Sequence, residues 1–159
     1  MKNFLKETTD MNAPTLAYYV RTEKQKFIYG KFYNHPEKIM NDIGIDKEIP
    51  TKEMKLLLEN KKIEMRSSCQ GDELYGPFFI FRMIGQNNNK EYIDKLCQYM
   101  NDTGSYKKII CKFGIGRGQG DYRIIVTSTF TKNEVNDIEY KKWWKISVNK
   151  LELILNKLS

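Results

Sequence analysis

Two short polar turns carry the side chains best suited to binding chemistry. The tripeptide Gln-Gly-Asp occurs at Gln70–Asp72 and again at Gln119–Asp121, with arginines near both copies. Arginine presents a planar fork of donors that matches phosphate oxygens, while serine and glutamine side chains suit sugar and base edges. The pattern therefore predicts a site for a phosphate-bearing ligand. Its candidate residues are Arg66, Ser67, Ser68, Gln70, Arg117, Gln119 and Arg123.

The second turn contains a run of alternating glycines, Gly114, Gly116, Gly118 and Gly120. This spacing is neither a dinucleotide-binding fingerprint, which needs a glycine at Gln119, nor a Walker A loop, which needs Gly-Lys-Ser/Thr. Alternating glycines leave one face of a strand without side chains, so a ligand or another backbone can approach closely. The run favours a simple hairpin tip, with a phosphate cradle formed by backbone N–H groups as the alternative.

The alternation of side chains along the strands indicates which cations share a face. Glu64, Arg66 and Ser68 fall on one side of their strand, and Lys112 and Arg123 alternate with apolar neighbours on theirs. We expect Arg66, Lys112 and Arg123 to lie on one open sheet face, with Arg82 nearby. In the alternative arrangement, nearby carboxylates neutralise these cations; the candidates are Glu64, Asp72, Glu73 and Asp121.

Catalytic chemistry has weaker support than binding, and no catalytic residue is predicted. The Ser67-Ser68-Cys69 run lacks a nearby base, and His35 is the only histidine. A single histidine without a Cys-x-x-Cys pair makes a metal site improbable, and none is predicted. Asp72 and Asp121 could form a carboxylate pair for acid–base work, but hydrogen bonding to their own turns is the more ordinary role.

Composition limits the class of protein. The chain has 159 residues, of which 40% are hydrophobic and 13% aromatic, so we expect a single folded domain over residues 1–159 with a flexible arm at 1–14. Its 27 Lys and Arg against 20 Asp and Glu give a net charge of +7, which favours anionic partners. Three unpaired cysteines and no signal-like or membrane-spanning stretch predict a cytoplasmic protein without membrane association.

The predicted elements describe an α+β fold, with a mixed sheet built from two ββα hairpin units packed with helices. An aromatic N-terminal hairpin over 16–33 and a short helix over 37–43 come first. Strands at 63–69 and 77–84, and a second hairpin over 106–130, form the sheet. Helices are predicted from Thr51 as N-cap to 60, over 90–101, and from a capping box at Thr131 and Glu134 to the C-terminus. The two glycine turns are expected to meet at one end of this sheet and line a basic cleft.

The last predicted helix carries a core stripe at helical spacing, formed by Tyr140, Trp144, Val148, Leu151, Leu155 and Leu158. Ile146 and Leu153 lie roughly opposite that stripe. Two apolar residues on the outer face of a helix indicate a self-association surface, so a homo-oligomer formed through the C-terminal helix is expected.

The same segments resemble a known family. Asp46–Asp72 is similar to the helix and Ser-Ser-Cys-Ser-Gly strand of the tRNA wybutosine-synthesizing protein 3 family, with matches at Ser67, Ser68, Cys69 and Gly71. Gly76–Met83 and Phe113–Thr129 resemble later strands of that family. The resemblance implies methylation of a hypermodified guanosine in tRNA with S-adenosylmethionine. However, Asp72 replaces a basic residue, and Glu73–Gly76 replaces a longer insertion, so the resemblance implies the fold more strongly than the reaction.

Three functional hypotheses follow. The first is binding of a phosphate-bearing ligand, either tRNA, another RNA or a free nucleotide, between the two glycine turns. The second is an S-adenosylmethionine-dependent tRNA methyltransferase. The third is a small viral-type inhibitor or sponge, which binds a host defence protein or captures its nucleotide signal.

Overall fold

The computed structural model describes residues 48–102, 104–115 and 122–158. In these ranges the chain forms α5 (Thr51–Glu59), β1 (Ile63–Cys69), β2 (Phe78–Met83), the 3₁₀ turn η1 (Gly85–Asn87) and α6 (Lys90–Asn101). These are followed by β3 (Ile109–Ile115), β4 (Tyr122–Ser128), the 3₁₀ turn η2 (Lys132–Glu134) and α7 (Asp137–Leu158). The α+β class is confirmed.

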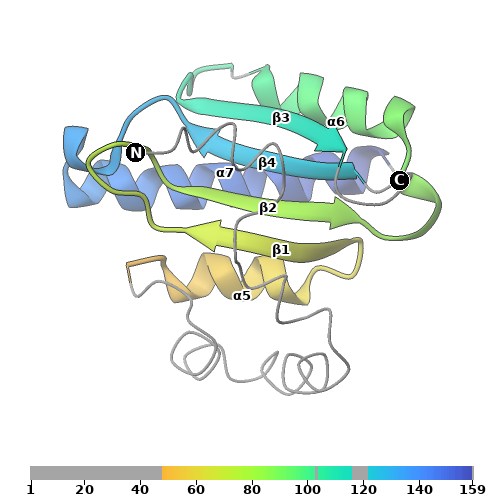
Figure 1. The fold of residues 1–159 in the computed structure, drawn as a ribbon, viewed down its shortest axis with the longest axis horizontal. Helices are drawn as coiled ribbons and strands as arrows, with labels where there is room; N and C mark the ends of the chain where they lie inside the picture. The colour runs from red at the N-terminus through yellow and green to blue at the C-terminus, as the bar shows by residue number, and fades with distance from the viewer. Residues whose placement is uncertain (1–47, 103, 116–121, 159) are drawn as a thin grey trace.

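The four described strands form one sheet in the order β1-β2-β4-β3 (Figure 1). Every pairing among them is antiparallel, so the described part of the expected mixed sheet contains no parallel pair. β1 and β3 are its two edges. The register of β1 against β2 shifts between Met65 and Ser67, which marks a β-bulge at Arg66.

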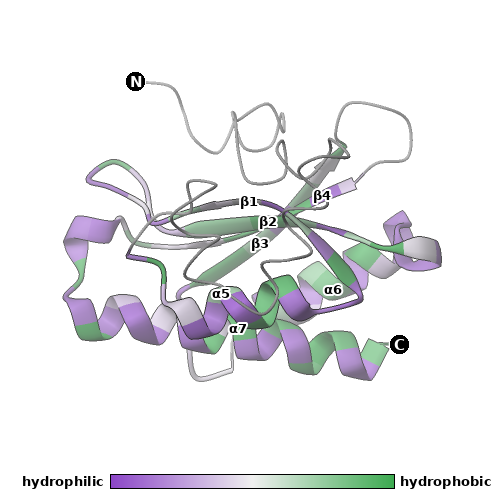
Figure 2. Ribbon diagram, turned by 90° about the horizontal axis from the view of Figure 1, so that it is seen from below, coloured by the Kyte–Doolittle hydropathy of each residue, from purple (hydrophilic) through white to green (hydrophobic). Residues whose placement is uncertain are grey.

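All three described helices lie on one face of this sheet (Figure 2). The core between them combines alternate strand residues such as Met65, Phe79 and Ile124 with the inner faces of the helices. At its centre Phe79 stacks on Trp144, with ring centroids 5.8 Å apart, and Trp143 meets Trp144 edge-on. The opposite face of the sheet carries none of the described helices (Figure 2).

The starts of the helices follow from local chemistry. The Asn89 side chain accepts a hydrogen bond from the Tyr92 backbone N–H at 2.9 Å and so caps the start of α6. Asparagine is one of the preferred residues at this position. The N-cap of α5 is Pro50 and not Thr51, so that prediction is wrong by one residue. Proline is tolerated at the start of a helix because the first N–H groups have no intrahelical partner.

The C-terminal helix begins later than predicted. The capping box of Thr131 and Glu134 is present, but it closes the 3₁₀ turn η2, and α7 starts at Asp137. Its expected core stripe is buried from Tyr140 to Leu155, and the helix additionally buries Trp143 and Ile154. Ile146 packs partly against the core, whereas Leu153 is 62% exposed.

The predicted arm at 1–14, the aromatic hairpin over 16–33 and the helix over 37–43 lie outside the described residues. Within the ranges that the structure describes, no helix combines the length and apolarity needed to cross a bilayer.

Candidate functional site: a cationic sheet face and a separate polar pocket

The described strand ends that flank the two glycine turns lie at opposite ends of the sheet. The first turn joins Cys69 to Phe78, and Phe78 pairs with Thr127 near the end of β4. The segment 116–121 joins Ile115 to Tyr122, the end of β3 to the start of β4. Because β4 runs antiparallel to β2, its start lies at the far end of the sheet from the start of β2 (Figure 1). The predicted cleft between the two turns is therefore wrong.

The register does gather most of the predicted cations on one face. Arg82 lies opposite Glu64 on β1, and continuing the pairing of Phe81 with Ile124 places Arg82 opposite Arg123. Arg123 in turn pairs with Gly114, and Lys112 pairs with Ile125 two positions along. Because their neighbours Phe81 and Ile124 belong to the core under the helices, these residues belong to the opposite face of the sheet. This part of the sequence prediction agrees with the register.

Glu64 connects two of the arginines. Its carboxylate accepts a hydrogen bond from the Arg66 guanidinium and lies 3.9 Å from Arg82 Nη1. The alternative in which carboxylates pair with the cations is thus partly realised at Glu64. Arg123 is only 1% exposed and Arg66 7%, whereas the Arg82 side chain is 31% exposed and Lys112 lies at the surface. The face therefore has a buried layer of guanidinium groups and a more accessible layer.

The bulge in β1 corrects the predicted alternation. The extra residue at Arg66 shifts the later residues by one, so Ser68 lies opposite the core residue Phe79. Ser68 therefore belongs to the helix side and not to the side of Glu64. Ser67 pairs with Ile80 in the backbone register. Arg117 and Gln119 lie outside the described residues.

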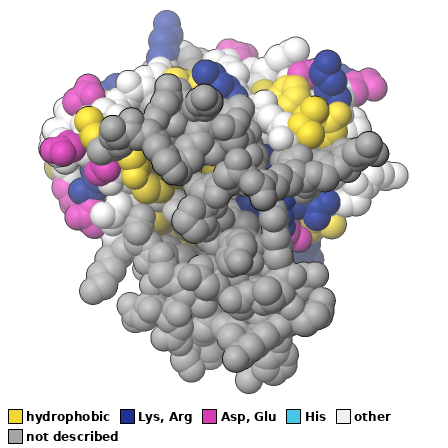
Figure 3. Space-filling view, in the orientation of Figure 1, with side chains coloured by type: hydrophobic (Ala, Val, Ile, Leu, Met, Phe, Trp, Pro, Cys, Tyr) yellow, Lys and Arg dark blue, Asp and Glu magenta, His cyan; other side chains and the backbone are white. Residues whose placement is uncertain are grey.

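The same sheet face is apolar toward the first turn. Phe78, Ile80 and Ile125 form a small cluster there, and Cys69 and Tyr75 pack against it. Cys69 is thus a packed small residue, as its sequence context indicated. In the space-filling view of this face, dark-blue Lys and Arg side chains are visible to the right of centre, among hydrophobic and uncharged ones (Figure 3).

The first turn uses its polar residues for its own structure. Asp72 Oδ1 accepts hydrogen bonds from the backbone N–H groups of Leu74 and Tyr75, at 2.7 and 3.2 Å, as expected for an aspartate in a turn. The Gln70 carbonyl accepts from the Tyr140 hydroxyl at 2.7 Å, and its side chain accepts from the Glu48 N–H. These bonds attach Gln70 to α7 and to the segment before α5.

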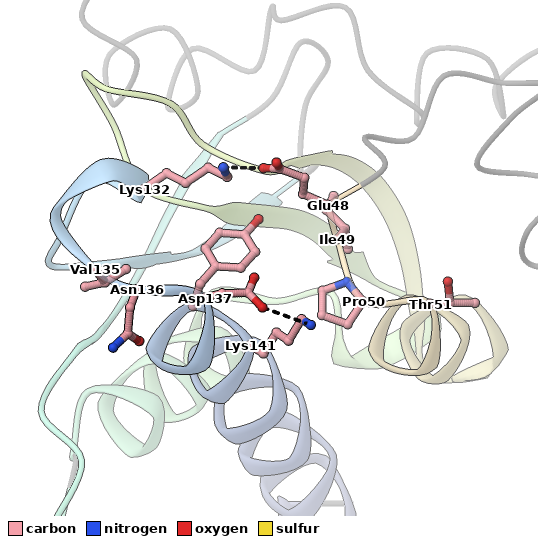
Figure 4. Close-up of a pocket in the computed structure, with 10 residues that line it drawn as sticks. Glu48, Ile49, Pro50, Thr51, Lys132, Val135, Asn136, Asp137 and Lys141 are labelled. Atoms are coloured by element: carbon pink, nitrogen blue, oxygen red, sulfur yellow. Dashed lines mark ion pairs between the residues drawn. The ribbon is translucent and has the colours of Figure 1, made fainter.

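Beside Gln70 lies a cavity of about 450 Å³ that no sequence pattern predicted. It opens between the start of α5 and the start of α7, and Lys132 and Lys141 point toward it from η2 and α7 (Figure 4). Lys132 pairs with Glu48, and Lys141 pairs with Asp137 at 3.0 Å. Since its walls come from 48–51 and 132–141, no local spacing signals it. Both lysines are already matched by carboxylates, so the cavity has no excess positive charge.

The described residues hold no group of three or more His, Cys, Asp or Glu side chains arranged to bind a metal ion.

No protein-family model matches the chain, and no curated protein or solved structure is significantly similar to it. The likeness to the wybutosine-synthesizing family, and the methyl transfer it implies, therefore stay predictions. Chemically, the sheet face that carries Arg66, Arg82, Lys112 and Arg123 offers guanidinium and ammonium donors, which are groups that bind anions.

Proposed function

We propose that this protein binds a phosphate-bearing ligand, either RNA or a nucleotide, on the face of the sheet formed by Arg66, Arg82, Lys112 and Arg123, which we name the cationic face. The observation that carries the proposal is the convergence of these four cations from all four strands. They are separated by up to 57 positions in the sequence, so only the sheet register brings them together.

The layering of the face suits a binding role. Arg82 and Lys112 are the accessible members, and they can reach a phosphate without rearrangement of the core. Arg66 and Arg123 are the buried members of the face, and Arg66 is paired with Glu64. The contacts of Glu64 with Arg66 and Arg82 hold both guanidinium groups near β1, which limits the conformational entropy lost on binding.

The residues of the second glycine turn extend the proposal. Arg117 and Gln119 belong to the segment that joins β3 to β4, next in the chain to Ile115 and Tyr122. Arg123 and Gly114 stand beside those strand ends. Arg117 and Gln119 lie outside the described residues and stay candidate ligand-binding residues, while Ser68 and Gln70 are not part of the cationic face.

The test measures binding of two probes to the full chain. Fluorescence anisotropy with a labelled 12-nucleotide oligouridylate and with a fluorescent ATP analogue, each at 50 and 200 mM salt, distinguishes a polymeric from a mononucleotide ligand. Replacing Arg82 and Lys112 together by alanine should weaken binding of the preferred probe about tenfold or more. For RNA it should also reduce the slope of log K against log salt by roughly 1.4, or about 0.7 for each phosphate that is no longer neutralised.

The matched control removes two positive charges elsewhere. Lys95 on α6 and Lys157 on α7 are exposed residues of the helical side of the molecule. A K95A/K157A variant has the same net charge as R82A/K112A, so it should keep nearly the wild-type affinity. Equal weakening by both variants would mean that only net charge matters, and absence of binding to either probe would remove the proposal.

A further inference from the structure

Two buried thiols face each other between α6 and β3. The Sγ atoms of Cys97 and Cys111 are 3.5 Å apart, and both cysteines are reduced. Cys97 is 7% exposed and Cys111 2%. A disulfide bond needs a sulfur–sulfur distance of about 2.0 Å, so the two atoms must approach by about 1.5 Å. Small side-chain rotations at two facing cysteines can produce a shift of that size.

Polar contacts hold this pair at the end of a helix and at a sheet edge. The Asn101 side chain donates to the Cys111 carbonyl at 2.9 Å and accepts from the Cys111 N–H at 2.7 Å. The Lys150 ammonium donates to the carbonyls of Met100, at 3.1 Å, and Asp102, at the last turn of α6. The thiols are thus aligned by contacts at the end of α6, and loosening that end would expose them.

We propose that Cys97 and Cys111 form a redox-active dithiol site, which closes to a disulfide when a small peroxide reaches it. The sulfur of Cys97 attacks one oxygen of hydrogen peroxide, the O–O bond breaks, and one water leaves, which gives a sulfenic acid. The sulfur of Cys111 then attacks the Cys97 sulfur. The S–S bond forms, the S–O bond breaks, and a second water leaves with the Cys111 proton. Two electrons pass from the two thiols to one peroxide.

The two cysteines have different roles in this sequence. Cys111 donates its S–H hydrogen bond to Cys97, and that bond together with burial raises the pKa of the Cys111 thiol well above its ordinary value. Cys97 is the more exposed of the two and accepts that bond. Cys97 is therefore the thiol that meets the oxidant, and Cys111 is the thiol that resolves the sulfenic acid.

Closure would attach α6 covalently to the edge strand β3. The loop between the two cysteines includes the end of α6 and the turn before β3. A bridge across a loop of this length restricts the unfolded chain, so the oxidised protein should unfold at a higher temperature than the reduced one. The substrate class of the site is hydroperoxides, and two molecules of a thiol such as glutathione would reduce the bridge back to the two cysteines, with glutathione disulfide as the product.

The experiment treats the folded full chain with hydrogen peroxide, quenches remaining thiols with N-ethylmaleimide in denaturant, and maps the products by mass spectrometry. Cys69 provides an internal reference, because it packs on the other face of the sheet, away from the pair. The expected product is a peptide pair joined between Cys97 and Cys111, two hydrogens lighter than the reduced pair. Full alkylation of Cys97 and Cys111 while Cys69 oxidises, or separate sulfinic acids on the pair, would overturn the proposal.

A second arm tests the access route. Replacing Lys150 by methionine removes the ammonium that holds the end of α6, so the bridge should form several-fold faster than in the wild type. The control is K157M, which changes a lysine farther along the same helix. Equal rates of bridge formation in K150M and wild type would reject the proposed route. The C69S variant must still form the bridge, because Cys69 is not part of the pair.

Discussion

Two adjacent tryptophans show how much one polar atom can matter inside this core. Trp143 and Trp144 are both fully buried and in contact with Phe79. The Trp143 indole N–H donates to the Lys108 carbonyl at 3.0 Å. Among the described residues, the buried indole nitrogen of Trp144 has no hydrogen-bond partner. The two side chains therefore bury similar apolar area, but only one of them satisfies its polar group.

This difference predicts that W143F destabilises the protein more than W144F. Both changes remove similar ring area, but W143F also loses a hydrogen bond, whereas W144F removes an unsatisfied buried donor. The Lys108 carbonyl keeps its hydrogen bond from the Thr129 N–H, so the difference should be about 1 kcal/mol in the free energy of unfolding. Urea denaturation of the two variants measures it, and a larger loss in W144F would contradict the argument.

At single residues, strand alternation predicted the face of some side chains correctly and of others wrongly. Alternation placed Lys112 and Arg123 on one face, with Arg82 nearby, because side chains along an unbroken strand alternate. The same reasoning failed for Ser68, since one bulged residue reverses every later position of β1. No feature of the sequence around Arg66 marks that bulge. The pairing of Glu64 with two arginines was foreseen only as one of two alternatives.

The turn at 70–76 is an element whose shape depends on backbone space. Gly71 has φ +84°, and a Cβ on it would lie 2.7 Å from the Gly76 carbonyl carbon and 2.8 Å from the Pro77 nitrogen. Gly104 also has positive φ, +53°, but a Cβ there would meet nothing within 4 Å. The two glycines share the conformational requirement and differ in the room around them.

Substituting alanine at each position separates these two effects. G104A should cost about 1 kcal/mol, because an L-residue in the left-handed region is strained. G71A should cost about 3 kcal/mol, since the new methyl group also collides with backbone atoms that cannot rotate away. Chemical denaturation gives both values. Equal losses at the two positions would show that steric crowding at the turn is unimportant.

Element boundaries were predicted where local signals act alone. β1 and α6 have the predicted bounds because strand propensity and the Asn89 cap identify their ends directly. The start of α7 was placed too early because a capping box closes a 3₁₀ turn as well as an α-helix. Such a motif specifies that a helical turn begins, and the long helix starts after Asn136, whose side chain accepts a hydrogen bond from the Glu139 N–H at 2.8 Å.

For the whole molecule, the decisive choice is how the two hairpins join. A parallel pairing of β2 with β4 would have put both glycine turns at one end of the sheet. Their antiparallel pairing separates the strand ends that flank the two turns. The residues that the two hairpins bring together are therefore arginines of the strands and not residues of the turns. Sequence patterns within each hairpin carry no information on this choice, because either pairing buries the same alternating residues.

The attachment of α7 to the start of β3 makes the stability of the whole molecule depend on pH. The Lys108 ammonium donates to Glu139 at 2.6 Å, and this bond lowers the pKa of the Glu139 carboxyl below its ordinary value of 4.5. A carboxyl with a lowered pKa in the folded state stabilises the fold above its unfolded-state pKa. That contribution disappears as the pH falls through the folded-state pKa.

E139Q should therefore lower the melting temperature by about 2 °C at pH 7, and the difference from wild type should shrink as the pH falls through the lowered folded-state pKa of Glu139. D137N is the matched control, because Asp137 also lies in the first turn of α7 but forms a mostly exposed pair with Lys141. Its effect should be smaller at pH 7. Thermal unfolding between pH 3 and 7 tests both, and a difference that persists undiminished at pH 3 would exclude the electrostatic explanation.

The Asn101 side chain has one more consequence, which concerns contact between molecules. β3 is an edge of the sheet, and unpaired backbone groups at an edge can recruit a strand from a neighbouring molecule. At Cys111 the carboxamide occupies both the outward N–H and the outward C=O, as a partner strand would. A foreign strand would have to displace it to extend the sheet there, so this one amide protects the protein against edge-to-edge aggregation.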